Sequence, residues 1–184
     1  MTIPAARHAR SLMAGEPFIE TQRLTLRELD TNDASFILKL LNEPSFLLFI
    51  GDKGVRTLVD AQAYLVGGPM ASYEQHGFGL YLVSLHECGT PVGTCGLLKR
   101  EAMDAPDIGF AFLPEYWSYG YAFESAKEII SRARSLLGLE RLIAITAPDN
   151  HASIKLLTRL GFVFDKTLAH FGDAGESNLY ALDL

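Results

Sequence analysis

The sequence predicts an α/β fold in which helices flank one mixed, mostly antiparallel β-sheet. Two observations support this prediction. Short β-rich runs alternate with helical patterns along the 184 residues, and a long amphipathic helix separates two short strands in the second half. Strands joined by tight turns pair antiparallel, whereas strands joined through a helix pair in parallel. We therefore expect an antiparallel front half and one parallel pair, where the helix after residue 120 crosses over.

The front half is predicted to place two helices between its strands. Residues 19–28 alternate between polar and apolar, with Leu24 and Leu26 on one face, as in a half-buried strand. Thr31 is a candidate N-cap ahead of apolar residues at helical spacing. The second helix is expected to end or break at Gly67-Gly68-Pro69. In chain order, the predicted elements are a strand at 19–28, helices at 31–42 and 57–74, and a hairpin of strands at 78–86 and 91–99.

The back half is predicted to alternate strands and helices. Apolar residues recur at helical spacing from Ala122 to Leu137, and Gly138 follows where a C-terminal cap belongs. Asn150 is a good N-cap for the last helix, and Gly161 ends that helix. In chain order, the predicted elements are a strand at 107–112, a helix at 122–137, a strand at 141–146, a helix at 150–160, and strands at 161–171 and 177–182.

Length and composition favour one globular domain that binds no membrane, nucleic acid or metal. Hydrophobic residues make up 48% of the chain, and no apolar run approaches the roughly 18 residues that span a bilayer. The net charge of −6 opposes binding to a phosphate backbone. Cys88 and Cys95 form neither a metal-ligand pair nor C-x-x-C. We expect reduced thiols, a cytoplasmic location, a flexible tail at residues 1–16 and a single domain at residues 17–184.

Residues 114–122 join a strand to the long helix, and this junction has the features of an anion site. Gly120 stands at the helix start, where unpaired backbone N–H groups and the positive end of the helix dipole attract anions. Gly120 has no Cβ and Ala122 is small, so a ligand can approach the backbone closely. A bound diphosphate is the natural expectation, although strand–glycine–helix junctions are common in themselves.

The helix at 150–160 supplies a second motif. Asn150 and Ser153 lie in its first turn, Leu157 is expected to face inward, and Gly161-Phe162 follows. Taken alone, this segment is a capped amphipathic helix that leads into a strand. Its functional interpretation depends on the first motif, which precedes it at a fixed separation.

Together the two motifs resemble the acetyl-CoA-binding signature of GNAT acetyltransferases, most closely the RimJ/RimL-like branch. The branch pattern is an acidic residue-Ile-Gly, then Pro-x-x-Trp-x-x-Gly-x-Ala-x-Glu, and later Asn-x-x-Ser-x-x-x-Leu-x-x-x-Gly-Phe. The matching residues are Asp107, Ile108, Gly109, Pro114, Trp117, Gly120, Ala122, Glu124, Asn150, Ser153, Leu157, Gly161 and Phe162. The segment Thr21-Gln-Arg-Leu-Thr-Leu-Arg27 is similar to the branch's first strand, so the resemblance runs from about residue 19 to the C-terminus.

The resemblance implies an acetyl-CoA-dependent N-acyltransferase and a place for each part of the co-substrate. The strand at 107–112 would splay from the strand at 141–146, and the pantetheine arm would run in the gap. The backbone of residues 110–113 would bond that arm, and N–H groups of residues 118–122 would hold the pyrophosphate. The implied co-substrate-binding residues are Phe110, Phe112, Leu113, Trp117, Ser118, Tyr119, Gly120, Tyr121, Ala122, Asn150 and Ser153.

The resemblance also implies two catalytic residues, each with an alternative reading. Asp107 aligns with the carboxylate that serves as base in several GNAT enzymes; the alternative is a strand-edge carboxylate without a role. Ser153 resembles a serine near the CoA sulfur; the alternative is a first-turn serine bonded to the backbone. Two positions depart from the family. Tyr119 stands where the branch often has lysine, and Leu157 where many members carry a tyrosine that protonates the leaving thiolate.

The remaining expectations concern charged side chains, the acceptor and the class of activity. Glu124 is interpreted as a solvated or dipole-stabilising charge, and Arg159 as either a CoA-phosphate contact or part of a solvated helix face. The acceptor groove should involve residues 46–50, Tyr73 and residues 170–176. The acceptor would be a primary amine, on a peptide N-terminus or a small metabolite, and the protein a monomer or homodimer. The alternative is a catalytically silent CoA-binding or ligand-sensing module on the same fold; an NTPase is excluded because no G-x-x-x-x-G-K-[ST] occurs.

Overall fold

The structure, a computed structural model, describes residues 17–169 and 175–184. It contains an eight-stranded sheet of order β1-β2-β3-β4-β5-β6-β8-β7, in which only β5 and β6 pair in parallel among the described strands. The predicted fold class and the predicted parallel pair are therefore confirmed. The strands are β1 (Pro17–Glu20), β2 (Leu24–Glu28), β3 (Leu80–Leu85), β4 (Pro91–Leu98), β5 (Asp107–Phe112), β6 (Arg141–Thr146), β7 (Val163–Leu168) and β8 (Ser177–Asp183).

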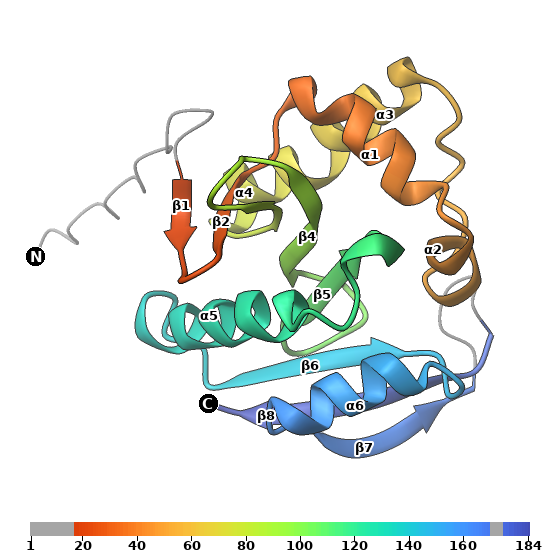
Figure 1. The fold of residues 1–184 in the computed structure, drawn as a ribbon. Helices are drawn as coiled ribbons and strands as arrows, with labels where there is room; N and C mark the ends of the chain where they lie inside the picture. The colour runs from red at the N-terminus through yellow and green to blue at the C-terminus, as the bar shows by residue number, and fades with distance from the viewer. Residues whose placement is uncertain (1–16, 170–174) are drawn as a thin grey trace, which may run out of the picture.

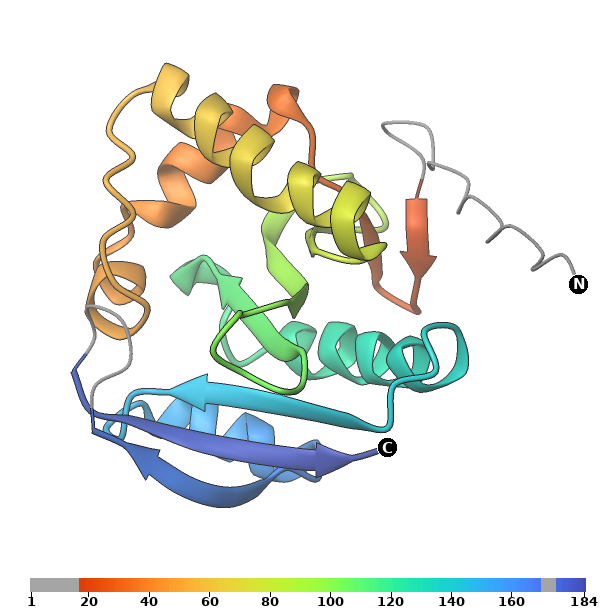
Figure 2. The same cartoon turned by 180° about the vertical axis from the view of Figure 1, so that it is seen from behind.

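Helices cover both faces of the sheet (Figures 1 and 2). In Figure 1, α5 and α6 lie on the near side, and Figure 2 brings α3 and α4 to the front. The helices are η1 (Thr31–Asp33), α1 (Ala34–Leu41), α2 (Pro44–Phe49), α3 (Leu58–Leu65), the π-helical segment η2 (Val66–Met70), α4 (Ala71–His76), η3 (Pro114–Tyr116), α5 (Tyr121–Ser135) and α6 (His151–Arg159). No helix in the described ranges is long and apolar enough to cross a membrane.

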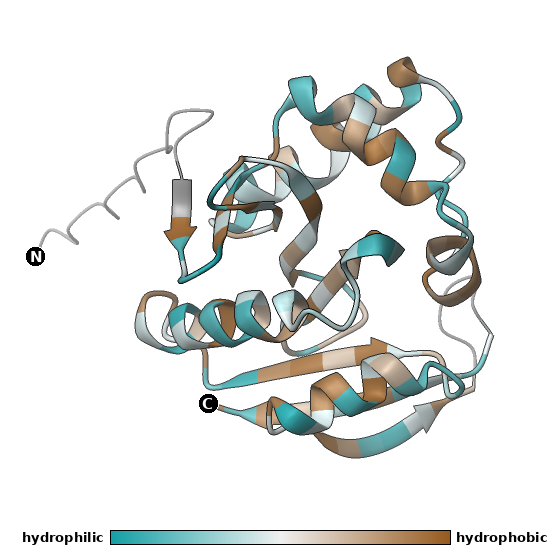
Figure 3. Ribbon diagram, in the orientation of Figure 1, coloured by the Kyte–Doolittle hydropathy of each residue, from teal (hydrophilic) through white to brown (hydrophobic). Residues whose placement is uncertain are grey.

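Alternating side chains along the central strands divide the core into two main clusters. On β3, Tyr81 and Val83 join the cluster under α5 and α6, whereas Leu82 joins the cluster under α1 and α3. Successive residues of a strand point to opposite faces, so a strand covered on both sides must be apolar throughout. Figure 3 shows this pattern on β6, which is hydrophobic along most of its length, and Leu142 and Ile143 of β6 are both buried.

The first predicted strand is two strands in the structure. Residues 19–28 were expected to run straight, but β1 and β2 form an antiparallel hairpin that turns at residues 21–23. The Thr21 hydroxyl accepts a hydrogen bond from the Leu24 N–H (3.0 Å), and the Thr21 N–H donates to the Leu24 carbonyl (2.9 Å). A side chain that pairs with a backbone group three residues away stabilises a turn, and alternation alone does not reveal it. The predicted tail, residues 1–16, lies outside the described residues.

Differences also occur among the early helices. Asp30, rather than Thr31, caps the first helical turn, through a capping box with Asp33. The short helix α2 was not predicted; it starts at Pro44, a residue suited to the first helical position. At Gly67-Gly68-Pro69 the helix does not end. It widens into one π-helical segment between α3 and α4, which accommodates a proline that has no N–H to donate.

Candidate active site

The parallel strands β5 and β6 separate soon after they start. Their register contains a single pair in the described chain, Asp107 with Ile143, and the Ile143 N–H donates to the Pro106 carbonyl (2.9 Å). On the other side of β5, by contrast, all six residues from Asp107 to Phe112 pair with β4. Beyond Ile108 the edge of β5 that faces β6 therefore carries backbone groups without a strand partner in the described chain. A splayed edge of this kind can hydrogen-bond an extended ligand.

The predicted pantetheine-binding residues differ in the backbone groups that they can offer. The Leu113 N–H donates to the Val92 carbonyl (3.0 Å), and the Leu113 carbonyl accepts from the Tyr116 N–H (2.9 Å). Both backbone groups of Leu113 are thus engaged, and its side chain is in the core. Backbone groups alternate between the two sides of a strand, so those of Phe110 face the gap. Phe110 is therefore better placed than Leu113 to hydrogen-bond a ligand in the gap between β5 and β6.

The loop after β5 is tied back to the strand by Trp117. Its indole Nε1 donates to the Phe112 carbonyl (2.8 Å), while 47% of the residue remains exposed. That bond occupies the Phe112 carbonyl and leaves its N–H for the gap. Farther along, Ser118 (φ 65°) and Gly120 (φ 83°) both have left-handed backbone conformations. Left-handed residues in a loop can turn successive N–H groups toward one side, as in anion-binding nests.

The loop ends at an open helix N-terminus. Helix α5 starts at Tyr121 with Gly120 as its N-cap, and no side chain of the described chain caps it. Gly120 accepts the first helical bond through its carbonyl, from the Glu124 N–H (3.0 Å). Uncapped N–H groups and the helix dipole make the residues around Gly120, Tyr121 and Ala122 suited to a phosphate. Gly120, Phe123 and Arg159 line an open pocket at this helix start.

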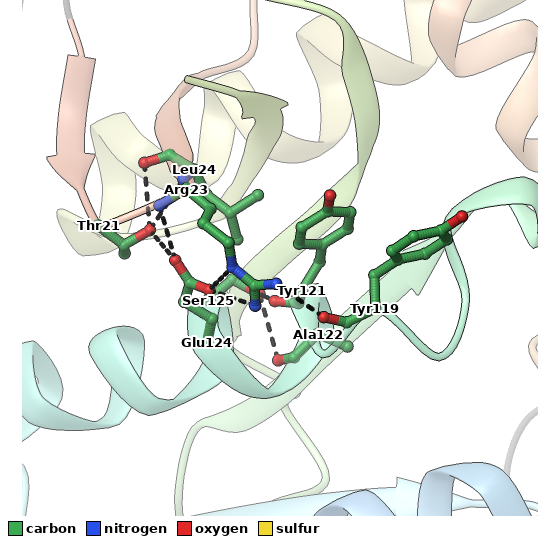
Figure 4. Close-up of polar contacts among 8 residues, drawn as sticks. All are labelled: Thr21, Arg23, Leu24, Tyr119, Tyr121, Ala122, Glu124 and Ser125. Carbon is green, nitrogen blue, oxygen red and sulfur yellow. Dashed lines mark hydrogen bonds and ion pairs between the residues drawn. The ribbon is translucent and has the colours of Figure 1, made fainter. Parts of the chain in front are cut away.

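A network that sequence reasoning missed joins the β1–β2 turn to this helix start (Figure 4). The Arg23 guanidinium bonds Glu124 through Nε (2.7 Å) and donates through Nη1 to the Tyr119 carbonyl (2.9 Å). The Thr21 hydroxyl donates to the second oxygen of Glu124 (2.6 Å). Glu124 is therefore a partly buried member of an ion pair and not a solvated charge. The sequence contained one signal for this network. Arg23 and Glu124 carry opposite charges, and both lie in segments that match the family pattern.

Asp107 is buried at the start of the gap, with 2% of the residue exposed. Its Oδ2 accepts a hydrogen bond from Arg100 Nε (2.6 Å), whereas its Oδ1 makes no hydrogen bond to any residue that the structure describes. Burial raises the pKa of Asp107 to about 6, although the neighbouring Arg100 guanidinium and, to a smaller extent, the Ile145 backbone N–H oppose the rise. A buried carboxylate oxygen without a partner is costly in a purely structural role. Sequence reasoning identified Asp107 but not Arg100.

Helix α6 places the second motif. The Asn150 side chain caps the helix by accepting from the Ser153 N–H (3.1 Å). The Ser153 hydroxyl forms no hydrogen bond within the described chain, so the backbone-bonded alternative for Ser153 is not what the structure has. Leu157 is 1% exposed and belongs to the core between α6 and the sheet. On the same helix, the Arg159 guanidinium stacks over Phe123 of α5 (4.5 Å to the ring centroid), beside the pocket at the α5 start.

The predicted acceptor groove is only partly described. Phe46 is a core residue, but Leu48 on the same short helix is 70% exposed. The Tyr73 hydroxyl accepts from the Leu29 N–H (3.0 Å) and donates to the Leu80 carbonyl. Tyr73 thus ties α4 to β3 and to the residue that follows β2, which is a structural task. Residues 170–174 of the predicted loop lie outside the described residues.

Comparison with known proteins decides the family. The profile of the acetyltransferase (GNAT) domain matches residues 23–163. The chain belongs to the GNAT acetyltransferases. The match covers both motifs as well as the Arg23 segment, and it makes this protein an acetyltransferase of the GNAT type. Among the described residues, no group of three or more His, Cys, Asp or Glu side chains could hold a metal ion.

Relatives and solved structures agree with that family. The uncharacterized N-acetyltransferase YoaA of Bacillus subtilis is 27% identical over 172 residues, which cover 90% of this chain and 96% of that protein. An acetyltransferase structure from Agrobacterium tumefaciens superposes with a TM-score of 0.77 at 24% identity and covers 96% of this chain and 99% of its own. RimL, a ribosomal L7/L12 alpha-N-protein acetyltransferase solved with coenzyme A, has a TM-score of 0.80 at 17% identity over 92% of this chain and 98% of its own. At these identities the two structures establish a shared fold.

Proposed function

We propose that the protein transfers the acetyl group of acetyl-CoA to a primary amine by direct attack of the amine nitrogen on the thioester. The observation that carries the proposal is the arrangement along β5. The buried carboxylate of Asp107 begins the strand, and the uncapped helix start at Gly120 follows its end. The open edge of β5 between them would bond the pantetheine arm, while the helix start would take the pyrophosphate. GNAT membership and the CoA-bound RimL structure support this choice of co-substrate.

The proposed reaction needs two proton movements. An alkylammonium acceptor titrates near 10.4 and a peptide N-terminus near 8, so the amine must first lose a proton at neutral pH. Asp107, with its pKa raised by burial to about 6, is mostly ionised at pH 7 and would accept that proton through a water molecule. As the C–N bond forms and the C–S bond breaks, the thiolate takes up a proton. Ser153, whose hydroxyl has no partner in the described chain, would donate or relay it.

The proposed acceptor is the amine of a peptide N-terminus or a small metabolite. The name of the RimL neighbour supports the first class, since RimL is described as an alpha-N-protein acetyltransferase. The net charge of −6 suits a cationic acceptor of either class. We expect the protein to act in the cytoplasm, as a monomer or homodimer.

The test is release of free thiol from acetyl-CoA against a panel of peptide and small-molecule amines. Calorimetric titration with CoA is run in parallel. We expect CoA binding, and thiol release that depends on at least one amine. Binding without any amine-dependent thiol release would contradict the proposal. It would favour a silent CoA-binding module, in line with the buried Leu157 where many family members carry a catalytic tyrosine.

A further inference from the structure

The β1–β2 turn holds both sides of Gly120 through one side chain. Arg23 bonds the Tyr119 carbonyl just before Gly120 (Nη1, 2.9 Å) and the Glu124 carboxylate one turn after it (Nε, 2.7 Å; Nη2, 2.6 Å). The guanidinium also lies over the Tyr121 ring, 4.9 Å from its centroid. Figure 4 shows the three contacts converging on the helix start from a segment almost 100 residues earlier in the chain.

The hydrogen bond from Arg23 to the Tyr119 carbonyl affects the orientation of the loop before α5. A peptide group has its N–H and C=O on opposite sides, so a carbonyl drawn toward Arg23 turns the following N–H, that of Gly120, the other way. Ser118, a residue other than glycine, has φ 65° in this loop. Such a conformation is disfavoured and persists only where surrounding contacts impose it. The Arg23–Tyr119 bond is such a contact, because a charged donor makes a strong hydrogen bond.

The contact between Arg23 and the Glu124 carboxylate affects the net charge at the start of α5. Glu124 lies in the first turn of α5, where a second anion such as a phosphate would be repelled. Arg23 neutralises that charge, and Thr21 bonds its other oxygen (2.6 Å). Burial opposes ionisation of Glu124, yet the hydrogen bonds from Thr21 and Arg23 hold its pKa below the ordinary value. The side chain is 19% exposed, so the pair is shielded from solvent on the glutamate side.

From these contacts we propose that Arg23 is a positioning residue for the pyrophosphate of CoA. It orients the Tyr119–Gly120 peptide and neutralises Glu124, so that the helix start can accept two further negative charges. The proposal rests on the proposed function only in taking CoA as the ligand.

The experiment measures dissociation constants by calorimetry for two ligands, CoA and pantetheine, which is the same thiol arm without the diphosphate and the 3′-phosphoadenosine. Arg23→Gln should weaken CoA binding by about 10-fold to 100-fold, the effect expected from losing a hydrogen bond to a charged group. Pantetheine binding should change by less than about 3-fold, because that ligand does not reach the loop. Partial unfolding of a variant would change its apparent dissociation constants for CoA and pantetheine by the same factor. The ratio of these two constants therefore does not depend on the fraction of folded protein.

A matched control is Arg141→Gln. Arg141 has a similar exposure (48% against 44% for Arg23) and also pairs with carboxylates, Asp183 and Asp165, but it lies at the start of β6 and its partners lie on β8 and β7. It should leave both constants unchanged. Arg23→Lys keeps the charge but lacks the guanidinium fork, which bonds Tyr119 and Glu124 through separate nitrogens, so its loss of CoA affinity should be intermediate. The same variant provides the test if Arg23→Gln does not fold.

The outcomes separate this inference from the proposed function. Equal losses for CoA and pantetheine, or unchanged CoA affinity in Arg23→Gln and Arg23→Lys, would overturn the positioning role. A wild-type protein that binds CoA but releases no thiol with any amine would refute the proposed function. In that case a selective loss of CoA affinity in Arg23→Gln would still support the inference, since the readout needs no acceptor.

Discussion

At the scale of single residues, Asp107 is the group whose protonation should be visible in the rate. Its raised pKa of about 6 means that the base is lost as the pH falls through 6, so kcat/KM should fall on that side. Asp107→Asn should lower kcat/KM at pH 7 by about 100-fold, at the lower end of general-base effects. It should also make the rate rise more steeply into the alkaline range, because the amine must then lose its proton to bulk water. A pH–rate profile of both proteins measures this; matching profiles would assign the proton to solvent in the wild type.

Ser153 should matter to the chemical step and not to co-substrate affinity. We expect Ser153→Ala to lower kcat by about 10-fold to 100-fold, at or below the usual range for general acid–base groups, because a thiolate with a reference pKa near 8.5 needs only modest help. Calorimetry should show little change in the affinity for acetyl-CoA. Thr158→Ala is the control on the same helix, since the Thr158 hydroxyl donates to the Ile154 carbonyl (2.9 Å). Normal turnover of Ser153→Ala would move the proton donor to solvent or to a nearby tyrosine.

The sequence identifies residues that belong to a family pattern more readily than the partners that tune them. Asp107 and Ser153 could be named because each stands at a defined place in a motif. Arg100, seven residues from Asp107, belongs to no motif, and its role follows from the loop that returns it to the start of β5. Arg23 and Glu124 both lie in matching segments, but a contact across 101 positions of the chain becomes visible only when the hairpin and α5 are placed.

At the scale of elements, the left-handed Gly120 allows a test of the helix start. Gly120→Val should abolish CoA binding, since a β-branched residue at φ 83° is strained by about 1–2 kcal/mol and must shift the loop. Gly138→Val is the matched control, because Gly138 also has a positive φ (63°) and follows the other end of the same helix. Both variants should lose similar stability in denaturant titrations, and only Gly120→Val should lose CoA affinity in calorimetry. Equal CoA affinities in the two would place the pyrophosphate elsewhere.

Elements with strong periodicity were predicted, and elements defined by local polar contacts were not. Helix α5 and strand β6 follow from long apolar patterns that tertiary packing reinforces. The turn between β1 and β2 depends on the Thr21 hydroxyl, whose bond interrupts an otherwise regular alternation. Helix α2 has six residues, too few for a period to be recognised. At Pro69 a local breaking signal was overridden, because flanking turns on both sides continue the helix.

At the scale of the whole molecule, the architecture follows from the order of elements, whereas the width of the gap does not. A helix between two strands predicts the parallel pair β5–β6, and the structure confirms it. The pair separates after one residue of register. The splay was expected from the family resemblance, since no local pattern encodes it.

The charge of Asp107 should make the stability of the whole fold depend on pH in an unusual direction. Its pKa is about 6 in the folded protein and near 3.8 in the unfolded chain, so folding favours the protonated form. The contribution to the free energy of unfolding is fully present below pH 4 and is lost as the pH rises through 6. A difference of about 2 pKa units corresponds to about 3 kcal/mol. Relative to Asp107→Asn, the wild type should therefore lose about that much stability between pH 4 and pH 7.

Urea titrations of both proteins at several pH values measure the difference. The lost contact with Arg100 shifts the variant's curve by a constant and leaves its shape, so the change with pH isolates the carboxyl group. Asp104→Asn removes an exposed carboxylate three residues away and serves as the control for net charge. A difference that stays flat from pH 4 to pH 7 would mean that Asp107 is as well solvated when folded as when unfolded. The basicity proposed for it in catalysis would then lose its physical cause, because burial would no longer raise its pKa.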